Sequence, residues 1–125
     1  MINPLTLHGQ AIGSMVQGLG GAFLEHMIYD DQGQLLTGSL ADYALPGASD
    51  FPNIRVVTLE NYPSPVNPLG AKGAGEGGII PVGGVIANAV AAALAPLGVS
   101  PCSLPLSASR VWQMIELARN NGKSS

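Results

Sequence analysis

The apolar positions between residues 9 and 27 recur with the period of an α-helix. They follow the spacing i, i+3, i+4, i+7 and i+11, which places them on one helix face: Ile12, Met15, Val16, Leu19 and Phe23. The same stretch contains four glycines (Gly13, Gly18, Gly20 and Gly21), each of which costs about 1 kcal/mol relative to Ala inside a helix. We therefore predict a helix over residues 9–27 against whose backbone another part of the protein packs closely.

The next third of the chain has patterns typical of extended structure. Asp30-Asp31-Gln32-Gly33 is a turn signal between residues 27–29 and 35–43, which predicts an extended segment or a hairpin. Pro46, Gly47 and Pro52 close this region. Residues 53–60 are rich in β-branched side chains and predict a strand. Asp42-Tyr43 is interpreted as a turn and packing device rather than a site.

Two further helices are expected after a long loop at residues 62–78, where prolines and glycines exclude regular structure. Residues 77–109 carry no charge, and we predict a buried helix over residues 81–94 that ends at Pro96-Leu97-Gly98. Pro81, Gly83, Gly84 and Asn88 disfavour a membrane span there. Ser107 is a good N-cap for a last amphipathic helix. The predicted fold is α+β, with a single segment over residues 1–119 and a flexible tail at 120–125.

Composition and charge narrow the class of protein. The 17 Gly and 10 Pro residues exclude a plain helical bundle, and the formal charge of −3 comes without a basic stripe that could bind nucleic acid. A compact chain of this size would expose roughly 6,000 Å², which 13 charged side chains cover thinly. We therefore expect a partner polypeptide or a homo-oligomer, not a membrane. Without a secretory signal and with only Cys102, interpreted as a core residue, the expected compartment is the cytoplasm.

The loop at residues 67–78 is the strongest candidate for chemistry. Its Gly73-x-Gly75-x-x-Gly78 spacing matches a dinucleotide fingerprint only formally, because no strand runs into it. A single carboxylate, Glu76, stands among these glycines. Two readings stay open for it: an N-terminal cap or first-turn acid of the following helix, or a general base beside a cofactor or substrate.

Other polar residues are weaker candidates. Gln17 lies between apolar neighbours in the first predicted helix, where a core hydrogen bond is the simplest role for its amide. His8, His26 and Cys102 have no spacing typical of metal ligands, so no metal site made by side chains is expected.

Three blocks in a fixed order resemble the C-terminal end of the molybdopterin-binding large subunit of molybdenum hydroxylases, the family of xanthine dehydrogenase, aldehyde oxidase and carbon monoxide dehydrogenase. The resemblance is strongest to carbon monoxide dehydrogenase large chains and covers nearly the whole chain. The blocks are His8-Gly9-Gln10 through Val16-Gln17-Gly18-Leu19-Gly20, then Leu36-Thr37-Gly38-Ser39-Leu40-Ala41-Asp42-Tyr43-Ala44-Leu45-Pro46, and Asn67-Pro68-Leu69-Gly70-Ala71-Lys72-Gly73-Ala74-Gly75-Glu76.

The resemblance implies a role for each site residue. Glu76 corresponds to the active-site glutamate, which takes the proton from a molybdenum-bound hydroxyl while a hydride passes to the metal's sulfido ligand. Gln17 corresponds to a cofactor-contacting glutamine, and Ala74 with Gly75 to backbone that lies against the pterin. The implied cofactor is molybdenum with molybdopterin, of the cytosine dinucleotide type. Fe-S and FAD are expected only on partner subunits.

The family subunit is several times longer than this chain, so the resemblance implies that the chain is inactive alone. The expected function is a portion of a molybdenum hydroxylase that acts on an aldehyde, an N-heterocycle or carbon monoxide. Two alternatives stay open at this point. One is a noncatalytic interaction module or an inactive fragment, and the other is a small membrane protein built on residues 79–97.

Overall fold

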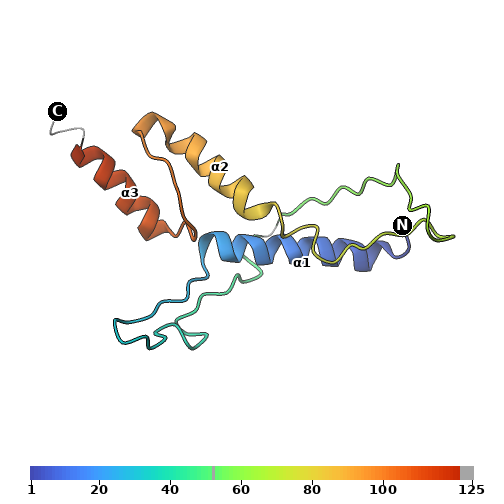
Figure 1. Cartoon of the computed structure of the whole chain (residues 1–125), viewed down its shortest axis with the longest axis horizontal. Helices are drawn as coiled ribbons and strands as arrows, with labels where there is room; N and C mark the ends of the chain where they lie inside the picture. Colours follow the sequence, from blue (N-terminus) through green and yellow to red (C-terminus); the bar gives the residue numbers. More distant parts are fainter. Residues whose placement is uncertain (52, 122–125) are drawn as a thin grey trace.

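The computed structural model describes residues 1–51 and 53–121. Its regular elements are helix α1 (Pro4–Phe23), helix α2 (Val82–Leu94), the short 3-10 helix η1 (Ala95–Leu97) and helix α3 (Ala108–Asn121). Figure 1 shows α1 along the long axis of the molecule, with α2 and α3 at its C-terminal end and long irregular segments on either side of it. The described chain is thus an elongated set of helices and not a compact globule.

Helix α1 begins five residues before the predicted start. Asn3 is its N-cap, with a side-chain oxygen that accepts from the N–H of Thr6 at 3.1 Å, and Pro4 occupies the first turn. The side chain of a capping Asn accepts from one of the free backbone N–H groups at a helix start, and a Pro in the first turn has no N–H group to satisfy. The helix therefore starts at this point despite the polar residues that follow. Its C-terminus also comes early, at Phe23. The N–H of Glu25 bonds to the carbonyl of Gly20 instead of Gly21, and the carbonyl of Ala22 accepts from Leu106 instead of from a next helical turn.

The glycines of α1 allow close packing at two positions. A Cβ on Gly18 would lie 2.7 Å from Cβ of Val82, so α2 contacts the helix backbone here, and a Cβ on Gly20 would lie 2.8 Å from Pro46. The predicted close approach is confirmed at these sites. Gly13 and Gly21 face open space within the described structure.

The core is small and lies where α1 ends. The N–H of Leu106 donates to the carbonyl of Ala22 at 2.6 Å, so the connector between η1 and α3 crosses the C-terminal end of α1. Ala22 and Leu106 are almost fully buried there, together with Val99. These few residues hold the helical end of the molecule together.

Helix α2 is confirmed at its predicted place, but the expectation that it is buried is wrong. The structure describes all of its residues and none is fully buried, and 60% of Val85 is exposed. One face contacts α1, while nothing in the described chain covers the other. The helix stops at η1 and at Gly98, whose φ of 70° is left-handed, as the Pro96-Leu97-Gly98 signal predicts.

The last helix is also confirmed. Ser107 precedes it, and its hydroxyl oxygen accepts from the N–H of Arg110 at 3.4 Å. Arg110 in turn donates to the carbonyl of Pro105 at 3.0 Å and to Ser103 at 2.7 Å, which anchors α3 to the connector. Asn120 and Asn121, the first two residues of the expected tail, are helical. The rest of that tail lies outside the described residues, so the tail and the 1–119 segment stay predictions.

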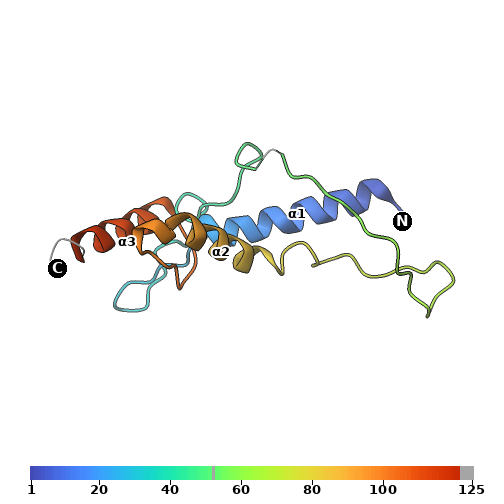
Figure 2. The ribbon, with the colours of Figure 1, turned by 90° about the horizontal axis from the view of Figure 1, so that it is seen from above.

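The predicted α+β class is confirmed only in its helices, because every regular element of the described chain is helical. Residues 24–47, here called the arm, project from the end of α1 (Figures 1 and 2). The turn at Asp30-Asp31-Gln32-Gly33 is confirmed, with Gly33 at a φ of 82°. The arm has one isolated antiparallel bridge, Tyr29 to Leu35, in place of paired strands. Pro52 lies outside the described residues.

The strand expected at residues 53–60 is also absent: this part of the described chain is extended but has no neighbouring strand with which to pair. A strand is defined by hydrogen bonds to another segment, and β-branched residues alone do not supply that segment. The strands of the α+β expectation are missing for this reason, since no sheet can form around a lone extended segment.

The exposed surface is large for a chain of this size. It measures 9110 Å², whereas a compact protein of 12.7 kDa exposes about 6,200 Å². Cys102 is exposed as well, so its interpretation as a core residue is wrong: in the connector between η1 and α3 the buried positions are Val99, Pro105 and Leu106. Among the helices of the described residues, none has the length and apolar character to cross a membrane.

Candidate active site

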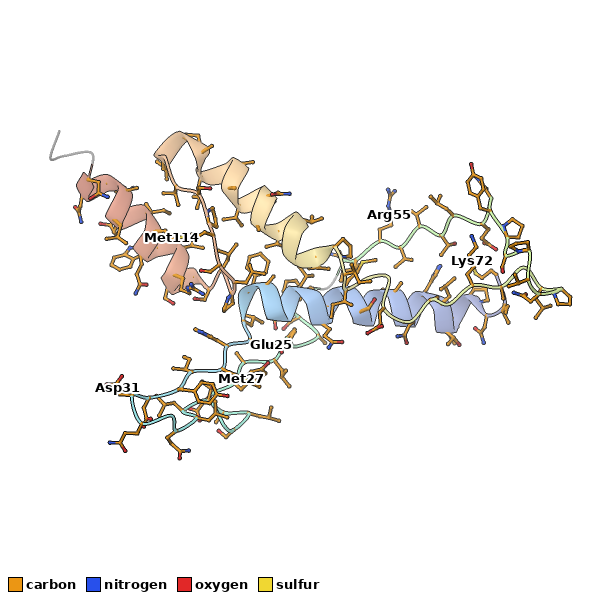
Figure 3. The ribbon with its side chains drawn as sticks, in the orientation of Figure 1. Glu25, Met27, Asp31, Arg55, Lys72 and Met114 are labelled. Carbon is orange, nitrogen blue, oxygen red and sulfur yellow. The ribbon has the colours of Figure 1, made fainter. Side chains whose placement is uncertain are left out.

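Residues 72–78, here called the Gly-rich segment, run beside the N-terminal half of α1. Both views show this segment next to the helix (Figures 1 and 2), and Figure 3 places Lys72 on it. The side-chain amide of Gln10 donates from Nε2 to the carbonyl of Gly75 at 2.9 Å. At the far end of the segment, a Cβ on Gly78 would lie 2.9 Å from the carbonyl oxygen of Ala11 and still closer to the hydroxyl oxygen of Ser14. Thus α1 holds the Gly-rich segment at two points.

The loop that precedes this segment is closed by Asn67. Its Oδ1 accepts from the N–H of Ala71 at 2.9 Å, and its Nδ2 donates to the carbonyl of Ala71 at 3.0 Å. Gly70, at a φ of 63°, packs so tightly on Pro63 that a Cβ there would lie 2.7 Å away. This turn fixes the point from which the Gly-rich segment returns to α1.

The backbone N–H groups of the Gly-rich segment are free. None of the seven, from Lys72 to Gly78, donates a hydrogen bond to any described residue. Around Gly73, Gly75 and Gly77, no side chain of the described structure lies where a Cβ would be. A run of exposed N–H groups without bulky neighbours is suited to a polar or anionic ligand that approaches the backbone closely.

Three of the four candidate site residues meet at one hollow, here called the site hollow, of about 300 Å³. Gln17 lines it from α1, and Gly75 and Glu76 line it from the Gly-rich segment, with Gly9 and Gly13 of α1 forming part of its wall. Ala74 lies instead at a larger hollow of about 820 Å³, on the side of the first residues of α1. The structure therefore brings Gln17 to Glu76 although the two are far apart in the sequence.

The cap interpretation of Glu76 is wrong. Helix α2 begins at Val82 with Pro81 as its N-cap, and the side chain at that cap makes no capping bond. Glu76 lies several residues earlier, in turns in which its carbonyl accepts from the N–H of Ile79 at 3.2 Å. Its exposed carboxylate has neither an ion pair nor a hydrogen bond with the described residues.

The core hydrogen bond expected for Gln17 is also wrong. Gln17 is exposed, and its amide bonds to none of the residues that the structure describes. The apolar neighbours that suggested burial point to other sides of the helix, because residues 16 and 18 are each rotated by about 100° from residue 17. The amide is thus available to a ligand in the site hollow.

Sequence reasoning missed Gln10 and Ser14. With Gln17 they form a polar stripe at i, i+4 and i+7 on α1, and all three line the site hollow. Such a stripe at helical spacing can be recognised in the sequence, because it lies on the side of the helix opposite the predicted apolar face. Among the described residues no cluster of His, Cys, Asp and Glu could hold a metal ion.

A second polar contact lies away from the site hollow. The hydroxyl of Tyr43 donates to Oε2 of Glu25 at 2.5 Å, and this bond to a carboxylate raises the pKa of Tyr43. Ser39 donates to Asp42 at 2.8 Å and its carbonyl accepts from the N–H of Tyr43. Asp42-Tyr43 is therefore a turn and packing device, as predicted, which ties the arm to Glu25 at the end of α1 (Figure 3).

Comparison with known proteins decides the family. Residues 1–52 match the profile of the molybdopterin cofactor-binding domain. The chain is 46% identical over 112 residues to subunit gamma of the 6-hydroxypseudooxynicotine dehydrogenase complex of Paenarthrobacter nicotinovorans, which covers 90% of this chain and 14% of that protein. The chain belongs to the molybdopterin-binding hydroxylase family. The resemblance to this family is thus confirmed, whereas its emphasis on carbon monoxide dehydrogenase is not, because the large chain of that enzyme from Hydrogenophaga pseudoflava is 36% identical.

Two other members agree. The carbon monoxide dehydrogenase large chain of Hydrogenophaga pseudoflava is 36% identical over 118 residues, with coverage of 92% of this chain and 14% of the relative. The crystal structure of quinoline 2-oxidoreductase from Pseudomonas putida 86 superposes with a TM-score of 0.86 at 42% identity, covering 93% of this chain and 15% of the other. This family member therefore spans about one seventh of the length of the relatives it matches, as a portion of a molybdenum hydroxylase large subunit.

The residues present fit a molybdopterin cofactor. Such a ligand is flat, polar and phosphate-bearing, and it needs donors on a surface that it can approach closely. The seven free N–H groups from Lys72 to Gly78 and the unpaired amide of Gln17 supply the donors. The bare backbone of Gly9 and Gly13, where a Cβ would meet nothing within 4 Å, supplies the access.

Proposed function

We propose that this chain is the C-terminal, glutamate-bearing portion of a molybdenum hydroxylase, in which Glu76 is the general base. The observation that supports this is the convergence at the site hollow: one carboxylate without a partner, one amide without a partner, and glycine backbone on two sides. A carboxylate that forms no ion pair within the chain is free to accept a proton from a reacting group.

Each site residue has a defined task in this proposal. The bound molybdenum cofactor supplies the redox chemistry. The carboxylate of Glu76 would accept a proton at the site hollow, and Gln17 and the backbone N–H of Gly75 would hold the cofactor by hydrogen bonds. Ala74 lines the larger hollow, so its part in the proposal rests on its backbone, which is continuous with that of Gly75.

The proposal extends to substrate and partners. Relatives include a dehydrogenase complex subunit, a nicotine 6-hydroxylase large subunit and carbon monoxide dehydrogenase large chains. A further relative is the molybdenum-binding subunit of an aldehyde oxidoreductase of Escherichia coli. From these names we infer a substrate that is an aldehyde, an N-heterocycle or carbon monoxide. We also infer a cytosine dinucleotide form of the cofactor, Fe-S and FAD on partner subunits, and a cytoplasmic location.

Replacing the carboxylate by its amide isostere tests the role of Glu76. The Glu76→Gln chain is assembled with the remainder of the subunit, and oxidation of the three substrate classes is measured together with the molybdenum content. General-base catalysis contributes about 10²- to 10⁴-fold in rate, so kcat should fall by that factor at unchanged molybdenum content. Glu116→Gln is the matched control, because Glu116 forms an exposed pair with Arg119 on α3.

Three outcomes are distinct. A large loss for Glu76→Gln and none for Glu116→Gln supports the proposal. Undiminished oxidation by Glu76→Gln overturns the role of Glu76. Loss of molybdenum together with activity assigns Glu76 to cofactor retention and also overturns the role as a base.

A further inference from the structure

Residues 53–60, here called the unpaired segment, have the form of a strand without its neighbour. The chain is extended through this stretch and runs above α1 (Figures 1 and 2). None of its backbone N–H or C=O groups forms a hydrogen bond with the described residues. At its end, the N-terminal ammonium group of Met1 pairs with Glu60.

The exposure of its side chains alternates with the period of a strand. Ile54, Val56 and Thr58 are partly buried, whereas the residues between them are exposed, including 67% of Val57 and 86% of Leu59. Arg55 points away from α1 (Figure 3). One face of the unpaired segment is therefore turned to this chain and the other outward, with both backbone edges open.

Open backbone edges specify the kind of partner. A helix or a small molecule cannot satisfy a regular row of N–H and C=O groups, whereas an extended polypeptide satisfies them by adding a strand. The β-branched residues of the segment favour this pairing.

The size of the exposed area indicates which polypeptide supplies the added strand. The chain exposes about 2,900 Å² more than a compact protein of its mass, from 9110 Å² observed and about 6,200 Å² expected. A standard interface covers only about 800 Å² on each partner. A second copy paired along eight residues would leave most of this excess uncovered. A body as large as the other six sevenths of the matched relatives can cover it.

We infer that the unpaired segment is an interaction surface that accepts a β-strand from the remainder of the large subunit and joins a sheet with it. This inference rests on the proposed place of the chain in a larger subunit, but it does not involve Glu76. The pairing anchors the loop that leads into the Gly-rich segment, since Leu59 and Glu60 line the larger hollow together with Lys72 and Ala74.

Hydrogen exchange of the assembled subunit tests the pairing directly. Amides of residues 53–60 should exchange at least 100-fold more slowly than unstructured amides, at every second residue if one edge is paired and at all residues if both are. Exchange at the unstructured rate along the whole segment in the assembled subunit overturns the inference. Protection that is already present in a homodimer of the chain alone overturns the choice of partner.

Proline substitutions provide a second test that is independent of activity. Neighbouring strand residues direct their N–H groups to opposite edges, so Val56→Pro and Val57→Pro each remove one donor from a different edge. At least one of them should reduce copurification with the remainder of the subunit by tenfold or more. Val56→Ala and Val57→Ala keep the N–H groups and should copurify normally.

Equal copurification of all four variants contradicts a paired strand. Loss in the Ala variants to the same extent as in the Pro variants also contradicts it, because side-chain contacts would then be the cause. The Glu76→Gln chain should assemble fully, so a failed strand and a failed catalytic role give different results.

Discussion

Replacing Gly18 with Ala tests the close contact between α1 and α2. The new Cβ would lie 2.7 Å from both Cβ and Cγ2 of Val82, well inside the ordinary carbon separation of about 3.5–4.0 Å. Overpacking of this kind costs about 1–3 kcal/mol. The higher helix propensity of Ala offsets about 1 kcal/mol of this destabilisation. The expected net effect is a destabilisation of about 0–2 kcal/mol.

Gly21→Ala is the matched control on the same helix, because a Cβ at Gly21 meets nothing within 4 Å. Gly21→Ala gains helix propensity without a steric clash. The free energy of local opening should therefore differ between the two variants by about 1–3 kcal/mol, which is about 5- to 150-fold in the opening equilibrium constant. Hydrogen exchange of α2 amides in the assembled subunit measures this equilibrium. We expect faster exchange for Gly18→Ala than for Gly21→Ala.

Moving the glycine to the other helix is the rescue. Val82→Gly removes the atoms that collide with the new Cβ, so the Gly18→Ala, Val82→Gly double variant should exchange more slowly than Gly18→Ala alone. Equal exchange in Gly18→Ala and Gly21→Ala would refute the reasoning, since it would mean that α2 does not approach the backbone of α1 at Gly18.

Three further predictions follow from individual contacts. Glu25→Gln should lower the pKa of Tyr43 towards its ordinary value, measured by absorbance at 295 nm with the other tyrosines changed to Phe. Because the pKa of Tyr43 is raised in the folded chain, its bond to Glu25 stabilises the folded state fully below pH ~10, the pKa of an unfolded tyrosine. This contribution to the free energy of unfolding is lost as the pH rises through the folded pKa. A free energy of unfolding that does not change at alkaline pH would contradict this. Gln10→Ala removes the 2.9 Å bond to the Gly-rich segment, so it should speed exchange of the Ile79 amide, which donates to the carbonyl of Glu76 in that segment. Unchanged exchange of this amide argues against the anchor. Asn67→Ala removes the two hydrogen bonds that close the turn at residues 67–71. The free energy of local opening of this turn should fall by about 1–3 kcal/mol, measured by hydrogen exchange. Exchange rates equal to those of the unaltered chain would show that the turn does not depend on these bonds.

Several elements could be predicted from local sequence because their hydrogen bonds are local. The helix over residues 81–94, the stop at Gly98, the cap at Ser107 and the turn at residues 30–33 depend on groups a few residues apart. The start of α1 also depends on neighbouring residues, because Asn3 and Pro4 form a capping signal. The prediction missed it because it used only the spacing of apolar residues.

The isolation of Glu76 among glycines is also visible in the sequence. What the sequence could not show is which groups Glu76 meets, because Gln17 reaches the site hollow only through the packing of the Gly-rich segment on α1. The polar stripe of Gln10, Ser14 and Gln17 is visible in the sequence, but the sequence does not show which segment covers that face of α1.

Burial and strand pairing were decided by tertiary structure alone. The unpaired segment has the composition of a strand, and α2 has the composition of a buried helix, yet neither has in this chain the neighbour that its residues require. A helix closes its own hydrogen bonds, whereas a strand and a buried face are completed by segments distant in sequence. The sequence by itself therefore determined where the helices and turns lie and which residues bear chemistry. Their exposure, their pairing and the meeting of Gln17 with Glu76 depended on the three-dimensional packing.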